Sequence, residues 1–327
     1  MKKTHEKRPS MKVVKKFVKI TQPSTFDFMK RFPDEKAARE YVESGRWPCG
    51  VRCSHCGHDV VYKIRDGKLY TCQACRKQFT IRTGTVMEDS KLPIRTWLYA
   101  MYLVSTSRKG ISSIQLAKEL GITQKSAWHV LGRIRVSCKI EGKIGGTVEA
   151  DETYIGGKEK NKHRNKRLHL GRGGVGKAIV FGARNRDGET RASVIPNTEG
   201  NTIAFNVQNN VAKGANLYTD EHRSYVGLKG YNHKSVNHGV GEYVKGMAHT
   251  NGIESFWALL KRGHYGTFHN LSFKHLQKYV DEFSFRQNTR NLPAVDMVEG
   301  SHGITFVRVL VAGMLGKKLT YKELIHD

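Results

Sequence analysis

Two pairs of cysteines constrain the folding of this chain more than any other feature. Cys53 and Cys56 form one CxxC pair and Cys72 and Cys75 form a second. The YKIRDGKLYT between them is typical of a hairpin that brings the pairs together. This spacing is a strong signal for a structural site in which four thiolates surround one Zn²⁺ ion. Disulfides or unligated thiols are the alternative, and a reducing cytosol disfavours disulfides. The sequence therefore predicts a zinc ribbon over residues 47–84.

The remaining cysteines and the nearby histidines carry weaker signals. Cys49 lies close to the pairs and could substitute for a ligand, but four are already in place and its role is open. His55 and His58 are not expected to be ligands. Cys138 falls in an amphipathic helix, so it is predicted to be a small core residue rather than a nucleophile.

The chain has a formal charge of +27, from 56 Lys and Arg residues against 29 Asp and Glu residues. A bias of this size indicates a polyanionic partner, because each cation placed on a phosphate releases a condensed counterion. Membrane surfaces are also anionic, but no apolar run approaches the roughly 20 residues of a spanning helix. The basic N-terminus lacks the apolar stretch of a signal peptide. We therefore expect nucleic acid as the partner, no membrane, and a cytoplasmic, nucleoid-associated location in a prokaryotic cell.

Composition and periodicity divide the chain into segments. They are a basic flexible arm (1–24), a short helical segment whose helix ends at Gly45 (25–46), the zinc ribbon (47–84), a helical region (92–138), an α/β domain (147–292) and a C-terminal extension (293–327).

The segment ISSIQLAKELGITQKSAWHVLGRIR predicts a helix-turn-helix within 92–138. Ser112 with Gln115 three residues later is typical of a capping box. Gly121 supplies the turn, and Thr123 can cap the second helix. The apolar face of the first helix is assigned to Ile114, Ala117 and Leu120.

The second of these helices is predicted to read DNA. The side chains expected to be exposed on it and to reach a groove are Gln124, Lys125, Ser126, His129, Arg133 and Arg135. An ordinary helical hairpin is the alternative, and the charge of +27 favours DNA binding.

The order of patterns in 147–292 matches an RNase H-like, integrase-type sheet flanked by helices. GTVEADETYIGG reads as a strand and KAIVFGARNRDGETRASVIP as a hairpin around Asp187-Gly188. NTIAFNVQNNVAKGA reads as a helix, ANLYT as a strand, and NGIESFWALLKRG as an amphipathic helix.

Three acidic residues occupy suitable places in this order. Asp151 lies on the first strand, Asp220 follows the strand ANLYT, and Glu254 lies near the start of the last helix. Such a set can converge on two Mg²⁺ ions that clamp the attacking and leaving oxygens of a phosphodiester. Any one acid alone is more often an N-cap, a solvated strand end or an ion-pair partner. Glu149 would face the same side of the strand as Asp151, so spacing alone leaves two candidates for the first acid.

A run of basic residues follows the strand that carries Asp151. It occupies 158–174 with Glu159 as the one acid, and it emerges near the predicted site. Phosphate contact is therefore the favoured interpretation, although such runs are usually solvated faces. Lys261 is two helical turns beyond Glu254 and is predicted to hold a phosphate beside the metals. The cations assigned to phosphates are Lys158, Lys162, Arg164, Lys166, Arg167 and Lys261.

Together these motifs resemble the DDE transposases of bacterial insertion sequences, in particular the group with an N-terminal zinc ribbon and an ISXO2-like integrase domain (the IS1595 family). The resemblance covers roughly residues 26–325. It rests on WPCGVRCSHCG, YTCQACRKQFTIRTGTVMEDSKLPIRTW, VEADETYIGGK, YTDEHRSY, HTNGIESFWALLKRGHYGTFHNLSFKHLQKYVDEFSFRQNTR and TYKELI.

The resemblance implies a transposase that binds terminal inverted repeats, cleaves the DNA ends by metal-assisted hydrolysis and transfers the 3′-OH strands into target DNA. It places the first acid at Asp151 rather than Glu149, the second at Asp220 and the third at Glu254, with two Mg²⁺ or Mn²⁺ ions. Because two double-stranded DNA ends must be held, at least a homodimer on DNA is expected. The alternatives are an RNase H-like nuclease or resolvase without strand transfer, and a DNA-binding regulator with a non-catalytic integrase-type domain.

Overall fold

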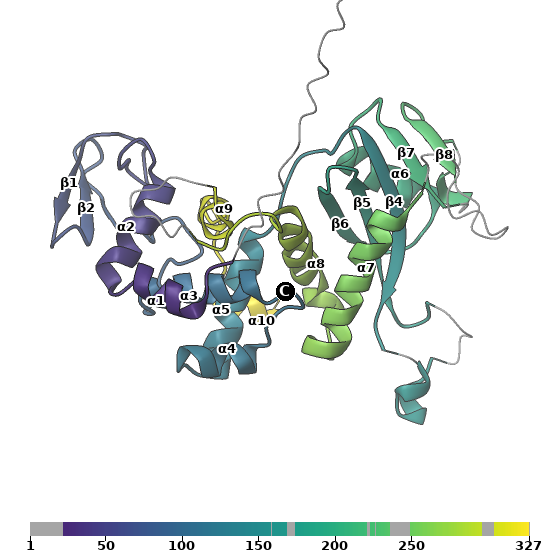
Figure 1. The fold of residues 1–327 in the computed structure, drawn as a ribbon, viewed down its shortest axis with the longest axis horizontal. Helices are drawn as coiled ribbons and strands as arrows, with labels where there is room; N and C mark the ends of the chain where they lie inside the picture. The colour runs from purple at the N-terminus through teal and green to yellow at the C-terminus, as the bar shows by residue number, and fades with distance from the viewer. Residues whose placement is uncertain are drawn as a thin grey trace, which may run out of the picture.

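A computed structural model describes residues 22–157, 159–168, 174–220, 223–225, 227–235, 249–295 and 304–326. Figure 1 shows three parts along the long axis: a cysteine-rich hairpin, a group of helices, and a sheet with its covering helices. The basic arm predicted over 1–24 lies almost entirely outside the described residues.

The ribbon is a small antiparallel sheet of β1 (Val61–Ile64), β2 (Leu69–Cys72) and β3 (Gln78–Phe79), in that order. The predicted hairpin is confirmed by the pairing of β1 with β2. The rings of Tyr70 and Phe79 stack with centroids 5.3 Å apart, and Trp47 packs edge-on against both. This cluster holds few apolar side chains, so the ribbon has little hydrophobic burial of its own.

Two helices, α1 (Thr25–Arg31) and α2 (Glu35–Arg46), precede the ribbon where the sequence predicted one short helix. The break falls at Phe32, because a proline disfavours helical backbone at the residue before it, and Pro33 follows. The side chain of Asp34 accepts a hydrogen bond from the backbone N–H of Ala37 at 2.8 Å and caps α2. The helix ends at Arg46 rather than at Gly45.

The helical region contains α3 (Ile94–Thr106), α4 (Ser113–Leu120) and α5 (Gln124–Ser137). The predicted caps are confirmed: Ser112 accepts from the N–H of Gln115 at 3.1 Å and Thr123 from that of Ser126 at 3.2 Å. The apolar face assigned to α4 is partly wrong. Ile114 is 61% exposed, and Leu116 is the buried side chain of that helix.

The end of the chain returns to these helices as α9 (Phe306–Gly313) and α10 (Tyr321–His326). Buried side chains of α1 to α5 and α9 form one continuous core, so we call α1–α5, α9 and α10 the helical body. Cys138 is fully buried in this core, as predicted. Within the described parts of the chain, no helix is long and apolar enough to cross a membrane.

The remaining elements form the α/β body, a mixed five-stranded sheet in the order β6-β5-β4-β7-β8 with three helices. Its elements are β4 (Thr147–Ile155), β5 (Ala178–Asn185), β6 (Thr190–Ile195), α6 (Gly200–Asn210), β7 (Asn216–Thr219), β8 (Asn232–Ser235), α7 (Asn251–Gly263) and α8 (Phe273–Asn288). β4 pairs antiparallel with β5 and parallel with β7. The predicted order of strand, hairpin, helix, strand and acidic helix is observed, with β8 as an unpredicted edge strand.

Alternation along β4 sends its side chains to two different layers. Val148 and Ala150 pack with α6 on one face, whereas Ile155 packs with α7 and α8 on the other. The α7 layer lies close to the sheet because Gly182 has no side chain: a Cβ there would be 2.5 Å from the ring of Trp257. This close approach brings α7 over the middle of β4 (Figure 1).

A buried ionic triad joins the two bodies. Arg135 of α5 donates from Nε to Oε2 of Glu282 at 2.7 Å, and Arg286 donates from Nε to Oε1 at 3.0 Å. Burial alone would raise the pKa of Glu282, but the guanidinium groups of Arg286 and Arg135 outweigh it and hold this pKa below its usual value. The prediction that Arg135 is exposed for DNA is wrong, because its charge neutralises Glu282 in the protein interior.

Candidate functional site

The four cysteines of the ribbon converge as predicted. Their Sγ atoms all lie within 4.8 Å of one another, with Cys53 and Cys75 3.7 Å apart and Cys56 and Cys72 3.6 Å apart. Four sulfurs placed tetrahedrally about 2.3 Å from a zinc ion are about 3.8 Å apart, so the donor set fits Zn²⁺. Cys49 is not in this group. The ring Nε2 of His55 lies 3.2 Å from the carbonyl oxygen of Gln78, in line with the expectation that it is no ligand.

Strand register brings Asp151 and Asp220 together. β4 and β7 run parallel, and Glu149 pairs with Tyr218 at the last printed position of the ladder. Asp151 and Asp220 are each two residues farther along their strands, so they lie side by side on the same face where the two strands separate. A pair of strand-borne carboxylates at this place is what the sequence predicted.

Asp151 is held by two hydrogen bonds and lies in a partly desolvated environment. Its Oδ2 accepts from the indole Nε1 of Trp257 at 2.9 Å, and its Oδ1 accepts from the backbone N–H of Glu152 at 2.8 Å. Burial raises the pKa of Asp151 to about 6, and the charges of Asp220 and Glu254 also act to raise it. The three predicted acids therefore interact electrostatically across the gap between the sheet and α7.

Glu254 enters this gap from the first turn of α7. Its Oε1 accepts a hydrogen bond from Oγ1 of Thr250 at 2.9 Å, and Thr250 is buried. Trp257, one turn farther along α7, contacts Asp151 as described, so the same helix supplies an acid and a positioning donor. Lys261 is half-buried and lies two turns beyond Glu254 on this helix.

Glu149, the competing candidate, has a different set of contacts. Its Oε2 accepts from the backbone N–H of Ile253 at 2.9 Å, at the start of α7. Its Oε1 lies 3.3 Å from Arg186 and 3.5 Å from His249. Gly252 makes room for this carboxylate, since a Cβ there would be 2.7 Å from Oε2. Glu149 therefore anchors α7 to the sheet, and the order of the two acids agrees with the choice of Asp151.

Glu152 is a fourth carboxylate at this end of the sheet that the sequence did not indicate. It lies on the opposite face of β4, where the hydroxyl of the buried Tyr225 donates to its Oε1. Burial raises the pKa of Glu152 to about 7, and the charges of Asp151 and Asp220 add to the effect. The motif YTDEHRSY contains this tyrosine, but only the fold brings it to β4.

The spacing of the three acids differs from that of the cysteines. Within the part of the chain that the structure describes, the cysteine group is the one set of three or more ligand atoms that are all within 4.8 Å of one another. Ions in two-metal sites lie about 3.5–4 Å apart, so their carboxylate ligands span a wider gap than those of a single ion. Like charges also repel when no cation lies between them. The donors of Asp151, Asp220 and Glu254 thus fit a pair of hard divalent cations.

The face of α5 that was predicted to read DNA is partly covered by the chain end. Nε of Arg133 donates to the carbonyl of Leu319 at 2.9 Å and its side chain is buried, so the prediction that Arg133 is exposed is wrong. His129 is half-buried against the same carbonyl at 3.3 Å. The ammonium of Lys125 lies 4.6 Å from the ring centre of Tyr321. Gln124 and Ser126 are exposed, as expected.

The basic run extends away from the sheet beyond the end of β4 (Figure 1). Arg164 and Arg167 are exposed there. Lys162 forms an ion pair with Glu159, so part of its charge is already neutralised. Lys158 and the side chain of Lys166 lie outside the described residues.

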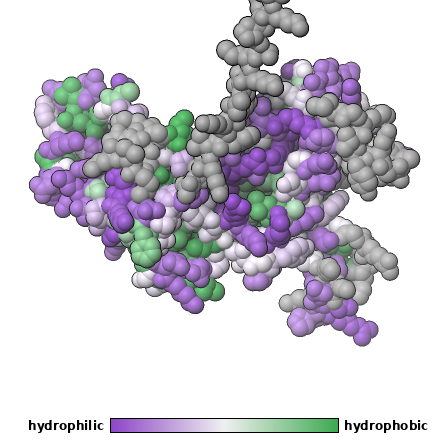
Figure 2. Space-filling view, in the orientation of Figure 1, coloured by the Kyte–Doolittle hydropathy of each residue, from purple (hydrophilic) through white to green (hydrophobic). Residues whose placement is uncertain are grey.

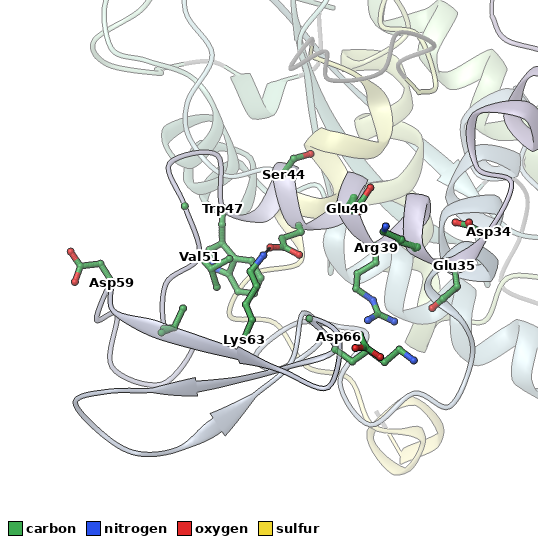
Figure 3. Close-up of a pocket in the computed structure, with 16 residues that line it drawn as sticks. Asp34, Glu35, Arg39, Glu40, Ser44, Trp47, Val51, Asp59, Lys63 and Asp66 are labelled. Atoms are coloured by element: carbon green, nitrogen blue, oxygen red, sulfur yellow. Dashed lines mark hydrogen bonds and ion pairs between the residues drawn. The ribbon is translucent and has the colours of Figure 1, made fainter.

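A cavity of about 1080 Å³ lies apart from these acids, between α2 and the ribbon (Figure 3). Lys63 of β1 forms an ion pair with Glu43 of α2 at 2.8 Å, and the hydroxyl of Tyr70 donates to Glu43 at 2.8 Å. These contacts fix the ribbon against α2. The charged lining residues are the acids Asp34, Glu35, Glu40, Glu43, Asp59 and Asp66 and the bases Lys36, Arg39, Lys63 and Lys68. The excess of carboxylates makes this groove unfavourable for a phosphate backbone.

Comparison with known proteins agrees with both sites. Residues 33–78 match the transposase zinc-ribbon domain, and residues 143–288 match the ISXO2-like transposase domain. The first range contains the four cysteines and the second contains the three acids. An uncharacterized protein in the transposable element ISH50 of Halobacterium salinarum is 28% identical over 289 residues, which cover 83% of this chain and 97% of that protein. A ribbon that gathers four thiolates, followed by a sheet that gathers three carboxylates, thus occurs in a chain that belongs to the IS1595 family of transposases.

Proposed function

We propose that this protein catalyses cleavage and strand transfer at the terminal inverted repeats of an insertion sequence. The observation that carries the proposal is the convergence of Asp151, Asp220 and Glu254 beside α7, within a domain that matches ISXO2-like transposases. One site serves both steps: water is the nucleophile in cleavage, and the freed 3′-OH is the nucleophile in strand transfer.

Asp151, Asp220 and Glu254 would hold two Mg²⁺ or Mn²⁺ ions. When bound, such ions supply Lewis-acid activation of the attacking oxygen and stabilise the charge on the leaving oxygen. Trp257 keeps Asp151 oriented through its indole hydrogen bond, and Thr250 does the same for Glu254. Lys261, Arg164 and Arg167 offer positive charge to the phosphates on either side of the scissile bond.

The ribbon, with one structural zinc, and the exposed start of α5 at Gln124 and Lys125 are proposed to recognise the terminal repeats as a helix-turn-helix module. Because cleavage and joining involve two DNA ends, the acting form would be at least a homodimer on DNA. These properties place the protein on the nucleoid of a prokaryotic cell.

Charge-removing variants of the three acids test the proposal. Asp151→Asn, Asp220→Asn and Glu254→Gln keep the size of each side chain but weaken its hold on a divalent ion. Each should lose both cleavage and strand transfer on oligonucleotides that carry the native inverted repeats, while DNA affinity stays near that of the wild type. Glu199→Gln is the matched control, since it removes an exposed carboxylate elsewhere on the α/β body.

The alternatives give different patterns in the same assay. Metal-dependent cleavage without joined products would favour a nuclease or resolvase. Retained cleavage in all three variants would refute the assignment of the site. Glu149→Gln should lower the melting temperature, because Arg186 and His249 lose their ion-pair partner, yet it should keep metal-dependent cleavage.

A further inference from the structure

We propose that a cavity between the helical body and the α/β body binds a phosphodiester group of the DNA backbone. The cavity has a volume of about 480 Å³ and is lined by the last turn of α3, one side of α7 and the end of α8. This inference rests on the proposed function, because it assigns part of the path of the same DNA. On the face drawn in Figure 2, hydrophilic side chains predominate where the two bodies meet.

The charges that line the cavity are all positive. Four arginines contribute to its wall and no carboxylate does: Arg108, Arg262, Arg286 and Arg290. Arg286 is buried and is neutralised by Glu282, so it adds structure rather than net charge. The other three are exposed to solvent and come from three different segments of the chain. Convergence of cations without an acid indicates a site for an anion.

A neutral side chain orients two of the cations without cancelling their charge. In the orientation that its neighbours favour, the amide oxygen of Gln287 accepts from Arg290 at 3.3 Å and from the mostly buried Arg184 at 2.8 Å. Burial lowers the pKa of Arg184, and the positive charge of Arg290 lowers it further. The two guanidinium groups therefore repel each other, and a bound anion would relieve this repulsion.

The neutral lining also suits phosphate oxygens, which accept hydrogen bonds from hydroxyl and amide groups. Ser105, Thr106 and Asn291 offer such donors, and guanidinium groups can bind phosphate in a bidentate manner. Ser255 of the lining is the residue after Glu254, so a strand held here would run alongside the helix that carries the third acid. Another explanation is that the arginines complement the negative ends of α3, α7 and α8. That explanation predicts an effect on stability and none on DNA.

The experiment measures the affinity for a short duplex of random sequence by fluorescence anisotropy at several NaCl concentrations. The variant is Arg262→Gln with Arg290→Gln. The control is Lys213→Gln with Lys229→Gln, which removes two exposed charges near the α6–β7 connection. Each lost phosphate contact should reduce the slope of log affinity against log salt by about 0.9. Between 50 and 200 mM NaCl the arginine variant should therefore lose roughly 10-fold less affinity than the wild type does.

A slope that differs from wild type in the arginine variant, stays unchanged in the control and is mostly restored by Arg262→Lys with Arg290→Lys would support the site. An unchanged slope, with or without a lower melting temperature, would overturn it and leave the arginines a role at the helix ends alone. Absence of DNA binding by the wild-type chain would overturn the proposed function as well, so the two failures are distinguishable.

Discussion

Glu282→Gln is expected to weaken the junction between the helical body and the α/β body more than any surface change. Removing one partner of a buried ion pair costs about 3–5 kcal/mol, since the remaining charge is left uncompensated. Here one carboxylate serves two buried guanidinium groups, those of Arg135 and Arg286, so the upper part of that range applies. The glutamine oxygen can still accept from one arginine, but its N–H₂ group then faces the other.

Hydrogen exchange followed by mass spectrometry measures this effect locally, which suits a chain of several structural parts better than a single melting curve. A loss of about 4 kcal/mol at the junction corresponds to an increase in exchange of roughly 10³-fold at the slowest amides of α5 and α8. The control is Glu141→Gln, whose side chain is 80% exposed and pairs only with Lys139 at 3.4 Å. It should change stability by less than about 1 kcal/mol.

The pH dependence gives a second readout. The pKa of folded Glu282 lies below the ordinary value of 4.5, so the stability that this carboxylate contributes is present above that value and is lost as pH falls through the folded pKa. Wild type should open the junction in acid, whereas Glu282→Gln should lack this step. If Glu282→Gln exchanged at α5 and α8 like wild type at pH 7, the reasoning on the triad would be refuted.

Two further predictions concern the metal sites. Purified protein should contain about one zinc ion per chain, and Cys72→Ser should lose the ion and unfold the ribbon because its apolar cluster is small; metal analysis with circular dichroism would reveal a zinc-free folded ribbon if this is wrong. Asp151 in the metal-free protein has a pKa of about 6, above the ordinary 3.8, so its ionisation costs stability as pH rises through this window. Asp151→Asn should therefore raise the melting temperature at pH 8 but not at pH 4, and an equal effect at both pH values would contradict the assigned cause.

Local patterns predicted much of the fold because their causes are local. Ser112 and Thr123 cap their helices with hydrogen bonds only three residues long, and the strand order follows from hydrophobic alternation and turn residues. The cysteine site was predictable because two short motifs and one hairpin fix all its ligands. The acids Asp151 and Asp220 lie together because a parallel ladder sets their register.

Contacts between distant segments account for what the sequence did not predict. Arg133 is hidden by the carbonyl of Leu319, and Arg135 by Glu282, which are 186 and 147 residues away along the chain. Periodicity along α5 says which residues share a face but not which later segment covers that face. The role of Glu149 as an anchor of α7 likewise depends on Ile253, 104 residues away.

The return of α9 to the first helices also bears on biosynthesis and on genetic decay. The core that begins with Phe28 and Phe32 is completed by Phe306 and Leu310, so a ribosome must translate nearly the whole message before this core can close. The α/β body, in contrast, has all its strands by residue 235 and its covering helices by 288. A nonsense mutation shortly after that point would leave the sheet and its acids intact but the helical body without α9. Early stop codons would therefore yield neither a competent enzyme nor a stable DNA-binding fragment that competes with intact copies.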